Sequence, residues 1–213
     1  MRELLAALPT AVLSDALDRL GLPGSLHGIG PLHEGRRACG PAFTVSYEPV
    51  GGEGGTVGDF LDDVPADAVV VIDNQGRTDC TVWGGIMTEV AAGAGVAATV
   101  INGACRDTAT SVRTRYPIWG AGRFMRTGKD RVRLVAVQQP VTIDGVTVEP
   151  GDMVCGDQDS VVVVPAGRAA DVAALGRAID AAESRILAAV AGGVSLAEAR
   201  ASQGYHALQS VRS

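Results

Sequence analysis

Two short apolar segments on either side of one amphipathic segment constrain the fold of this chain most strongly. Residues 68–73 (AVVVID) and 97–101 (AATVI) are apolar runs of the kind found in strands buried on both faces. Residues 84–95 between them predict a helix, with Ile86, Val90, Ala91 and Ala94 on its inward face. A strand, a helix and a strand of this total length form a βαβ unit, in which the two strands are parallel.

The flanking segments predict further helices and strands in one mixed α/β domain. The expected helices cover residues 11–20, 169–191 and 196–203, with Thr10 and Ser195 as caps of the first and the last. The expected strands cover residues 42–47, 118–120, 131–137, 153–155 and 161–164, with a hairpin over 141–148 that turns at Asp144-Gly145. Because no repeat or linker interrupts the 213 residues, we expect residues 1–213 to form a single domain.

The composition argues against several classes of partner. The net charge of −6 argues against nucleic-acid binding, which needs a basic surface. No apolar run approaches the roughly 20 residues of a membrane span. The N-terminal segment carries acidic residues and does not resemble a secretory signal. We therefore expect a cytoplasmic protein that binds neither nucleic acid nor membranes.

Cysteine and lysine usage narrows the chemistry further. The single lysine, Lys129, lies in an expected exposed turn (TGKDR), which argues against an imine-forming nucleophile. The cysteines form no C-x-x-C pair and show no zinc-site spacing, so we expect reduced, buried thiols. They are Cys39, Cys80, Cys105 and Cys155.

An adjacent cation and anion, Arg106 and Asp107, follow the second strand of the predicted βαβ unit after Asn102-Gly103. Ligands of open α/β sheets bind outside the carboxyl ends of the strands. Arginine offers a planar fork for a carboxylate, and aspartate offers an oxygen ligand for Mg²⁺. A surface arginine beside an aspartate that caps the next helix explains the pair equally well from spacing alone.

The segment Trp83-Gly84-Gly85-Ile86-Met87 opens the predicted crossover helix. Free backbone N–H groups at a helix start bind anions, and two glycines let a small carboxylate approach closely. The alternative is a glycine-rich turn without a ligand. If the βαβ interpretation holds, this segment and Arg106-Asp107 lie at the same edge of the sheet.

Several motifs, in order along the chain, resemble the RraA-like family. They are LPTAVLSDALDRLG, GRRACGPAFTV, WGGIMTEVAAGAGVAATVINGACRD, VEPGDMVCGDQDSVVVVP and AESRILAAVAGGVSLAEA, which together span roughly residues 8–200. The family includes class II 4-hydroxy-4-methyl-2-oxoglutarate and 4-carboxy-4-hydroxy-2-oxoadipate aldolases, oxaloacetate decarboxylases and regulators of ribonuclease E activity.

The resemblance implies a fold, an assembly and a site. The fold would be an α-β-β-α sandwich, assembled as a homotrimer or a dimer of trimers with the site between subunits. Arg106 would contact the pyruvyl group, and Asp107 would hold a divalent metal, Mg²⁺ or Mn²⁺. A neighbouring subunit's glutamate, best matched by Glu183, would approach the site. Backbone amides of four residues would bind the substrate carboxylate: Gly84, Gly85, Ile86 and Met87.

Two positions depart from the family pattern. Gly85 stands where many aldolase members carry an aspartate, which weakens the match to the classical aldolases more than to the decarboxylases. Ser160 stands in a turn where glycine is usual. The resemblance therefore implies a metal-dependent lyase that cleaves a C–C bond of a 2-oxo acid through a pyruvate enolate. The alternative is a non-catalytic regulator that binds ribonuclease E.

Overall fold

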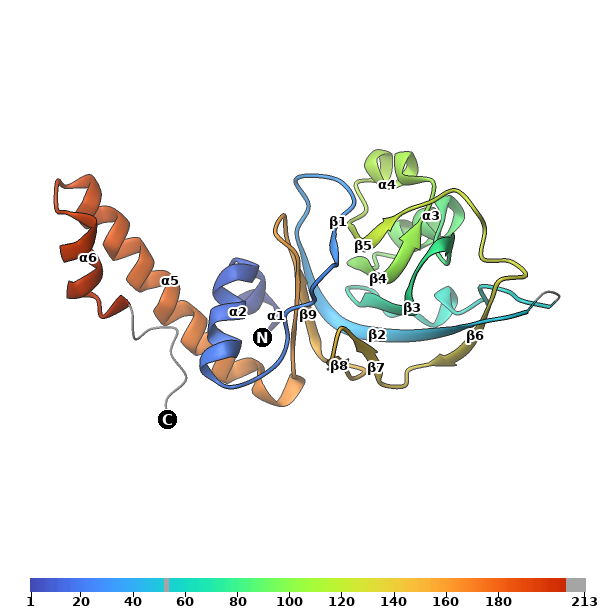
Figure 1. Ribbon diagram of the computed structural model, residues 1–213, viewed down its shortest axis with the longest axis horizontal. Coiled ribbons are helices and arrows are strands. Elements are labelled where there is room, and N and C mark those ends of the chain that lie inside the picture. The colour runs from blue at the N-terminus through green and yellow to red at the C-terminus, as the bar shows by residue number, and fades with distance from the viewer. Residues whose placement is uncertain (52–53, 206–213) are drawn as a thin grey trace.

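The computed structural model describes residues 1–51 and 54–205 as a mixed α/β domain built around one strongly curved sheet (Figure 1). The strands are β1 (Gly30–Pro31), β2 (Ala38–Pro49), β3 (Val69–Thr81), β4 (Ala98–Cys105), β5 (Ile118–Arg123), β6 (Val132–Val137), β7 (Val141–Ile143), β8 (Val146–Val148), β9 (Met153–Gly156) and β10 (Val161–Val164). The helices are α1 (Arg2–Ala6), α2 (Thr10–Arg19), α3 (Gly85–Gly93), α4 (Thr108–Thr114), α5 (Ala169–Ala191) and α6 (Leu196–Ser202), with short 3₁₀ turns η1 (Leu61–Asp63) and η2 (Ala166–Arg168).

The predicted βαβ unit is confirmed. β3 and β4 are parallel neighbours, and α3 connects them. The sheet order is β1-β5-β4-β3-β2-β9-β10, with β6 paired to β2 and with β7 and β8 as a separate hairpin. That hairpin turns as predicted at Asp144-Gly145, where both residues have positive φ.

One sheet supplies both β-layers, so the implied α-β-β-α sandwich is only partly correct. The long strand β2 pairs with β9 over its first residues and with β3 over its later ones. The sheet thereby bends until its two ends face each other and is nearly closed. Val71 of β3 and Val100 of β4 share one buried cluster with Val154 of β9 and Val163 of β10.

The position of β10 (Val161–Val164) between two buried clusters explains why its sequence is an unbroken run of valines. Successive side chains of a strand point to opposite faces. Val161 and Val163 face the interior of the curved sheet. Val162 and Val164 pack instead with Leu13 of α2 and other side chains of α1, α2 and α5. A strand that is buried on both faces has no solvent-facing position for a polar residue.

Both strands of the βαβ unit run further than the sequence predicts. β3 continues past Asp73 to Thr81, and β4 continues past Ile101 to Cys105, with register shifts in the added parts. The expected exit at Asn102-Gly103 is therefore wrong, because these residues lie inside β4. The extension places Arg106 directly after the strand end.

The cysteine prediction is wrong for one pair. Cys39 of β2 and Cys155 of β9 lie directly opposite each other and form a disulfide, with their Cα atoms 4.1 Å apart. The two residues are 116 positions apart in sequence, so only the strand pairing brings them together. Cys80 and Cys105 are buried free thiols, as expected.

The two predicted helix caps differ in outcome. The Ser195 hydroxyl accepts a hydrogen bond from the Glu198 N–H at the start of α6, as predicted. Thr10 is not a cap but the first residue of α2, after Pro9. Its N–H and its hydroxyl donate to the two carboxylate oxygens of Asp157, at 2.8 and 2.6 Å. An aspartate from the turn between β9 and β10 thus caps α2 from outside the helix.

The serine at position 160 serves this same turn. The Ser160 hydroxyl lies 3.1 Å from the carbonyl oxygen of Leu26 and 2.6 Å from that of Ile29, so it tethers the segment that leads into β1. The departure from glycine therefore bears on the fold. None of the helices in the described part of the chain has the length and apolarity of a membrane span.

We predict that Asp157→Asn lowers the free energy of unfolding by about 1–2 kcal/mol at pH 7, because it removes the charge from two partly buried hydrogen bonds. Burial opposes ionisation of Asp157, but the bonds from the Thr10 hydroxyl and N–H outweigh burial and lower its pKa. Its stabilising effect is therefore complete above the ordinary aspartate pKa of about 3.9 and is lost as the pH falls through the lower folded value.

Thermal unfolding followed by circular dichroism between pH 7 and pH 2 measures this difference. The exposed neighbour Asp159 supplies the control Asp159→Asn, which should change stability little. A stability gap between wild type and Asp157→Asn that widens in acid would contradict the assignment.

Candidate functional site

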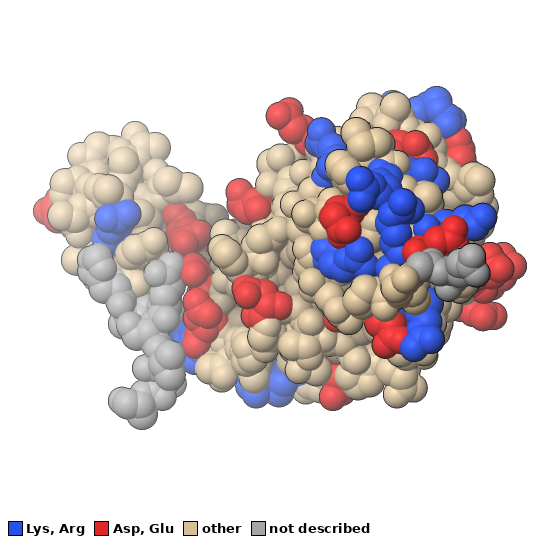
Figure 2. All heavy atoms as spheres, turned by 45° about the vertical axis from the view of Figure 1, so that its right-hand side comes forward, with Lys and Arg blue, Asp and Glu red and all other residues tan. Residues whose placement is uncertain are grey.

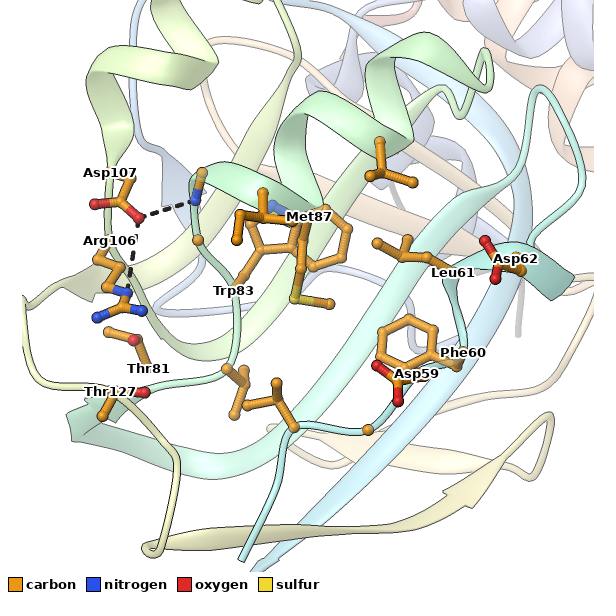
Figure 3. Close-up of a pocket in the computed structure, with 17 residues that line it drawn as sticks. Asp59, Phe60, Leu61, Asp62, Thr81, Trp83, Met87, Arg106, Asp107 and Thr127 are labelled. Carbon is orange, nitrogen blue, oxygen red and sulfur yellow. Dashed lines mark hydrogen bonds and ion pairs between the residues drawn. The ribbon is translucent and has the colours of Figure 1, made fainter.

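A cavity of about 400 Å³ opens between the start of α3, the end of β4 and the segment before η1. The glycine-rich helix start and the Arg-Asp pair that the sequence singles out both line this cavity (Figure 3). Their residues are Gly84, Gly85, Ile86, Met87, Arg106 and Asp107. The structure therefore brings the Arg-Asp pair and the glycine-rich helix start to one place, as the parallel strands require.

Asp107 adopts a backbone conformation that decides where its carboxylate points. Its φ of 57° and ψ of 36° are left-handed, which costs a non-glycine residue about 1–2 kcal/mol. It occupies the N-cap position of α4, yet its side chain makes no capping hydrogen bond there. Its Oδ2 instead accepts a 2.9 Å hydrogen bond from the Gly85 N–H at the start of α3. The alternative of an ordinary helix cap is therefore wrong.

Arg106 is anchored by its backbone and open at its guanidinium. Its N–H donates to the Trp83 carbonyl at 3.1 Å, which ties the end of β4 to the segment before α3. Its Nε lies 3.7 Å from Asp107 Oδ2, beyond a good hydrogen bond but within reach of charge attraction. The two side chains are 42% and 51% exposed, so each keeps hydrogen-bonding atoms available to a ligand.

The glycine pair lets α3 begin directly against Arg106 and Asp107. A Cβ on Gly84 would lie 3.1 Å from Asp107 Oδ2 and 3.3 Å from Arg106 Nε. A Cβ on Gly85 would lie 3.3 Å from both Asp107 Cβ and Thr110 Oγ1. These contacts are tighter than ordinary van der Waals packing, so any larger residue would push the pair away from the helix start.

The first turn of α3 lines the cavity and contains backbone N–H groups that have no partner within the helix. An α-helix has no internal carbonyl partner for its first N–H groups. Gly85 donates to Asp107, so the N–H groups of Ile86 and Met87 are those offered to an anion. Thr88 braces this turn, because its hydroxyl donates to the Gly84 carbonyl at 3.0 Å and accepts from Trp83 Nε1 at 2.9 Å.

The predicted inward face of α3 is partly wrong. Ala91 is buried, but Ile86 and Val90 are 84% and 43% exposed and border the cavity, and Ala94 is exposed as well. Thr88 occupies the buried position instead. The helix covers Gly85–Gly93 and packs the face of Thr88 and Ala91 inward, so Ile86 and Met87 line the cavity instead.

Beside Arg106, a metal would find one anchoring carboxylate, that of Asp107, because Asp59 and Asp62 lie at the far side of the cavity (Figure 3). Among the described residues, no group of three or more His, Cys, Asp or Glu could hold a metal ion. Mg²⁺ commonly binds through one or two carboxylates and completes its shell with water and substrate. The hydrogen bond from Gly85 engages Oδ2 of Asp107, so Oδ1 is the atom offered to a cation. The residues therefore fit an open divalent-metal site and do not fit a closed protein cage.

Two further residues from the sequence lie outside the chemistry of this cavity. Cys105 ends β4, but burial raises the pKa of its thiol to about 12, so it is protonated at neutral pH. Glu183 lies half-buried on α5, which Figure 1 shows at the opposite end of the domain from α3. Burial and the nearby carboxylates of Asp15 and Asp180 raise its pKa. Within one chain, Glu183 does not line the cavity, so its approach from a neighbouring subunit stays a prediction.

The wall opposite Arg106 has no clear signature in the sequence. Residues 57–62 form it, with Phe60 and Leu61 flanked by Asp59 and Asp62 (Figure 3). A Phe-Leu pair between glycine-rich and acidic residues is the one available signal, because apolar side chains in a loop need a surface to cover. Thr81 and Thr127, at the Arg106 end, carry no comparable signal.

Comparison with known proteins agrees with this architecture. The family model RraA-like, described as Aldolase/RraA, matches residues 10–163. A protein of Halalkalibacterium halodurans with the provisional name 4-hydroxy-4-methyl-2-oxoglutarate aldolase is 34% identical over 167 residues, 78% of this chain and 76% of that protein. A crystal structure of a protein from Pseudomonas syringae pv. tomato has a TM-score of 0.87 and 45% identity, and the match covers 93% of this chain and 96% of that one.

A longer relative matches as well. Protein DlpA of Legionella pneumophila is 40% identical over 194 residues, which cover 90% of this chain. The match covers 32% of DlpA, so this chain spans about a third of the length of that relative. The family model and the relatives together show that the chain belongs to the RraA-like family.

Proposed function

We propose that this protein is a divalent-metal-dependent lyase that cleaves a C–C bond of a 2-oxo acid. The reaction would be retro-aldol cleavage of a 4-hydroxy-2-oxo acid, decarboxylation of oxaloacetate, or both. The observation that supports this most is that Arg106, Asp107 and the start of α3 meet in one cavity. The provisional aldolase name of the Halalkalibacterium relative points the same way.

Each group of the cavity has a role in this proposal. The N–H groups of Ile86 and Met87 bind the substrate carboxylate, as helix starts bind anions. The Arg106 guanidinium donates to the keto oxygen, where negative charge develops. The Gly85 N–H holds the carboxylate of Asp107 in place. A metal ion such as Mg²⁺ or Mn²⁺, held by Asp107, would supply further Lewis-acid stabilisation of that charge.

In both reactions the electron pair of the broken C–C bond moves into a pyruvate enolate. In retro-aldol cleavage the C4 hydroxyl loses its proton to solvent water, the C3–C4 bond breaks, and C4 becomes a carbonyl. The electron pair of that bond moves into the pyruvate enolate, whose oxygen faces Arg106, and a proton from solvent then reaches C3. In decarboxylation CO₂ leaves in place of the carbonyl product. The two reactions therefore share the step that Arg106 stabilises.

Gly85 bears on the balance between the two reactions. Retro-aldol cleavage needs a base for the C4 hydroxyl, whereas decarboxylation does not. Gly85 has no side chain that could serve as that base. A Cβ at this position would lie 3.3 Å from Asp107 Cβ. The lack of a base at this position favours decarboxylation, so oxaloacetate has to be tested together with the 4-hydroxy-2-oxo acids.

We predict that Arg106→Ala lowers kcat/KM for pyruvate release by roughly 10²–10³-fold, because it removes the main donor to the developing oxyanion. Arg106→Lys keeps the charge but loses the planar fork, so an intermediate loss is expected. A lactate dehydrogenase-coupled assay over oxaloacetate and several 4-hydroxy-2-oxo acids measures the effect. Arg113→Ala is the control, since Arg113 forms a surface ion pair with Glu89 and does not line the cavity.

An absence of pyruvate release from every substrate would overturn the lyase proposal. A pull-down with purified ribonuclease E then tests the alternative of a regulator. Retained binding by Arg106→Ala in that pull-down would place the docking surface away from the cavity.

Removal of divalent metal should abolish activity. Dialysis against EDTA is expected to lower pyruvate release to background, and added Mg²⁺ or Mn²⁺ should restore it. Asp107→Asn should not be restored at the metal concentration that saturates the wild type, because the amide oxygen is a weaker cation ligand. The coupling enzyme is assayed alone in EDTA as the control. Full activity of EDTA-treated protein with oxaloacetate would refute the metal role.

We also propose a homotrimer or a dimer of trimers in which Glu183 of one subunit reaches the cavity of the next. Light scattering measures the assembly, and co-expressed mutants test the shared site. A mixture of Arg106→Ala and Glu183→Ala subunits should regain activity, because some interfaces pair an intact Arg106 with an intact Glu183. A mixture of Arg106→Ala and Asp107→Ala subunits should not, since both residues come from one subunit. A fully active monomer would contradict this assembly.

A further inference from the structure

We propose that, among 4-hydroxy-2-oxo acids, the cavity selects one whose substituent at C4 is apolar, an alkyl or aryl group, and not a second carboxylate. The inference rests on the proposed function for the identity of the 2-oxo acid end. It adds the chemical class of the remainder of the ligand, which the wall opposite Arg106 determines.

The cavity has two chemically different ends (Figure 3). Arg106, Asp107, Thr81 and Thr127 form the polar end. Figure 3 shows Met87 and Trp83 in the middle and Phe60, Leu61, Asp59 and Asp62 at the far side. A ligand whose carboxylate and keto group lie beside Arg106 therefore directs its distal carbons toward apolar side chains.

The side chains at the apolar end are held in place, because they pack in or against the buried core. Phe60 and Trp83 are 2% and 1% exposed and belong to the buried cluster beneath the cavity. Val57, Leu61 and Met87 are partly buried against the same cluster and turn their remaining surface to the cavity. A ligand that covers this surface removes it from water, which favours an apolar group at this end.

The charges that line the cavity oppose a second carboxylate. Among the lining residues that the structure describes, Arg106 is the one cation, whereas Asp59, Asp62 and Asp107 are carboxylates. A carboxylate at the far end would leave bulk water, face Asp59 and Asp62, and gain no cationic partner. Both aspartates are exposed, so salt screens part of this repulsion.

Among the described residues, no Lys or Arg other than Arg106 lines the cavity. Figure 2 shows Lys and Arg side chains gathered on one face of the domain, with Asp and Glu side chains among them. Arg77, for example, donates to both carboxylate oxygens of Asp79 at 2.9 Å and does not line the cavity.

The size of the cavity agrees with a substituent of this kind. A volume of about 400 Å³ lies within the range of roughly 300–1,000 Å³ that small-molecule pockets occupy. A three-carbon pyruvyl group fills only the end beside Arg106. The remaining space, bordered also by the exposed Ile86 and Val90, accommodates a group as large as a phenyl ring.

Calorimetric titration with two unreactive ligands tests the inference without catalysis. 2-Oxo-4-phenylbutanoate and 2-oxoglutarate share the 2-oxo acid end but carry a phenyl ring or a carboxylate at the other. In the presence of Mg²⁺, we expect 2-oxo-4-phenylbutanoate to bind at least tenfold more tightly. Equal or tighter binding of 2-oxoglutarate, or no binding of either ligand, would overturn the inference.

Variants of the far wall sharpen the test. The double variant Asp59→Asn/Asp62→Asn should tighten 2-oxoglutarate binding about two- to fivefold and leave the phenyl ligand within twofold, since it removes repulsion alone. Asp63→Asn, in the same 3₁₀ turn but outside the cavity lining, is the matched control and should change neither. Leu61→Arg should invert the preference, and the double variant alone decides the question if Leu61→Arg does not fold.

Pyruvate release from 4-hydroxy-2-oxo-4-phenylbutanoate separates this inference from the proposed function. Tighter binding of the phenyl ligand without pyruvate release from any substrate would support the apolar pocket and overturn the lyase. Pyruvate release combined with a preference for 2-oxoglutarate would support the lyase and overturn the apolar pocket.

Discussion

The hydrogen bond from the Gly85 N–H to Asp107 Oδ2 joins the start of α3 to the residue that follows Arg106. It turns the carboxylate away from α4, compensates in part for the left-handed backbone of Asp107, and forms without obstruction because Gly84 and Gly85 lack side chains. The cavity depends on this contact, since it brings the helix N–H groups, the guanidinium and the carboxylate oxygen into one small volume.

The curved sheet makes that contact possible. Parallel strands β3 and β4 end at the same edge, and their extension to Thr81 and Cys105 carries the chain to Trp83 and Arg106. The bond from the Arg106 N–H to the Trp83 carbonyl then fixes the two ends to each other. Buried cluster residues lie beneath this edge, so the polar groups are supported by packing that a ligand need not reorganise.

The sequence was informative where a pattern is local. The βαβ unit, the hairpin turn at Asp144-Gly145 and the bounds of α5 follow from periodicity and turn chemistry, and they are confirmed. Contacts between distant segments carry no such pattern: Thr10 meets Asp157 across 147 positions. The exposure of Ile86 depends on which face of α3 packs against the domain, and the structure buries the face of Thr88 and Ala91. The wall at Phe60 is visible only after the chain is folded.

A crystal structure with Mg²⁺ and oxalate, a planar mimic of the pyruvate enolate, tests the central claim most directly. We predict oxalate with one carboxylate on the N–H groups of Ile86 and Met87, the Arg106 guanidinium on an oxygen of the other, and the metal on Asp107. Oxalate and metal bound elsewhere, with Arg106 turned away from both, would contradict the account.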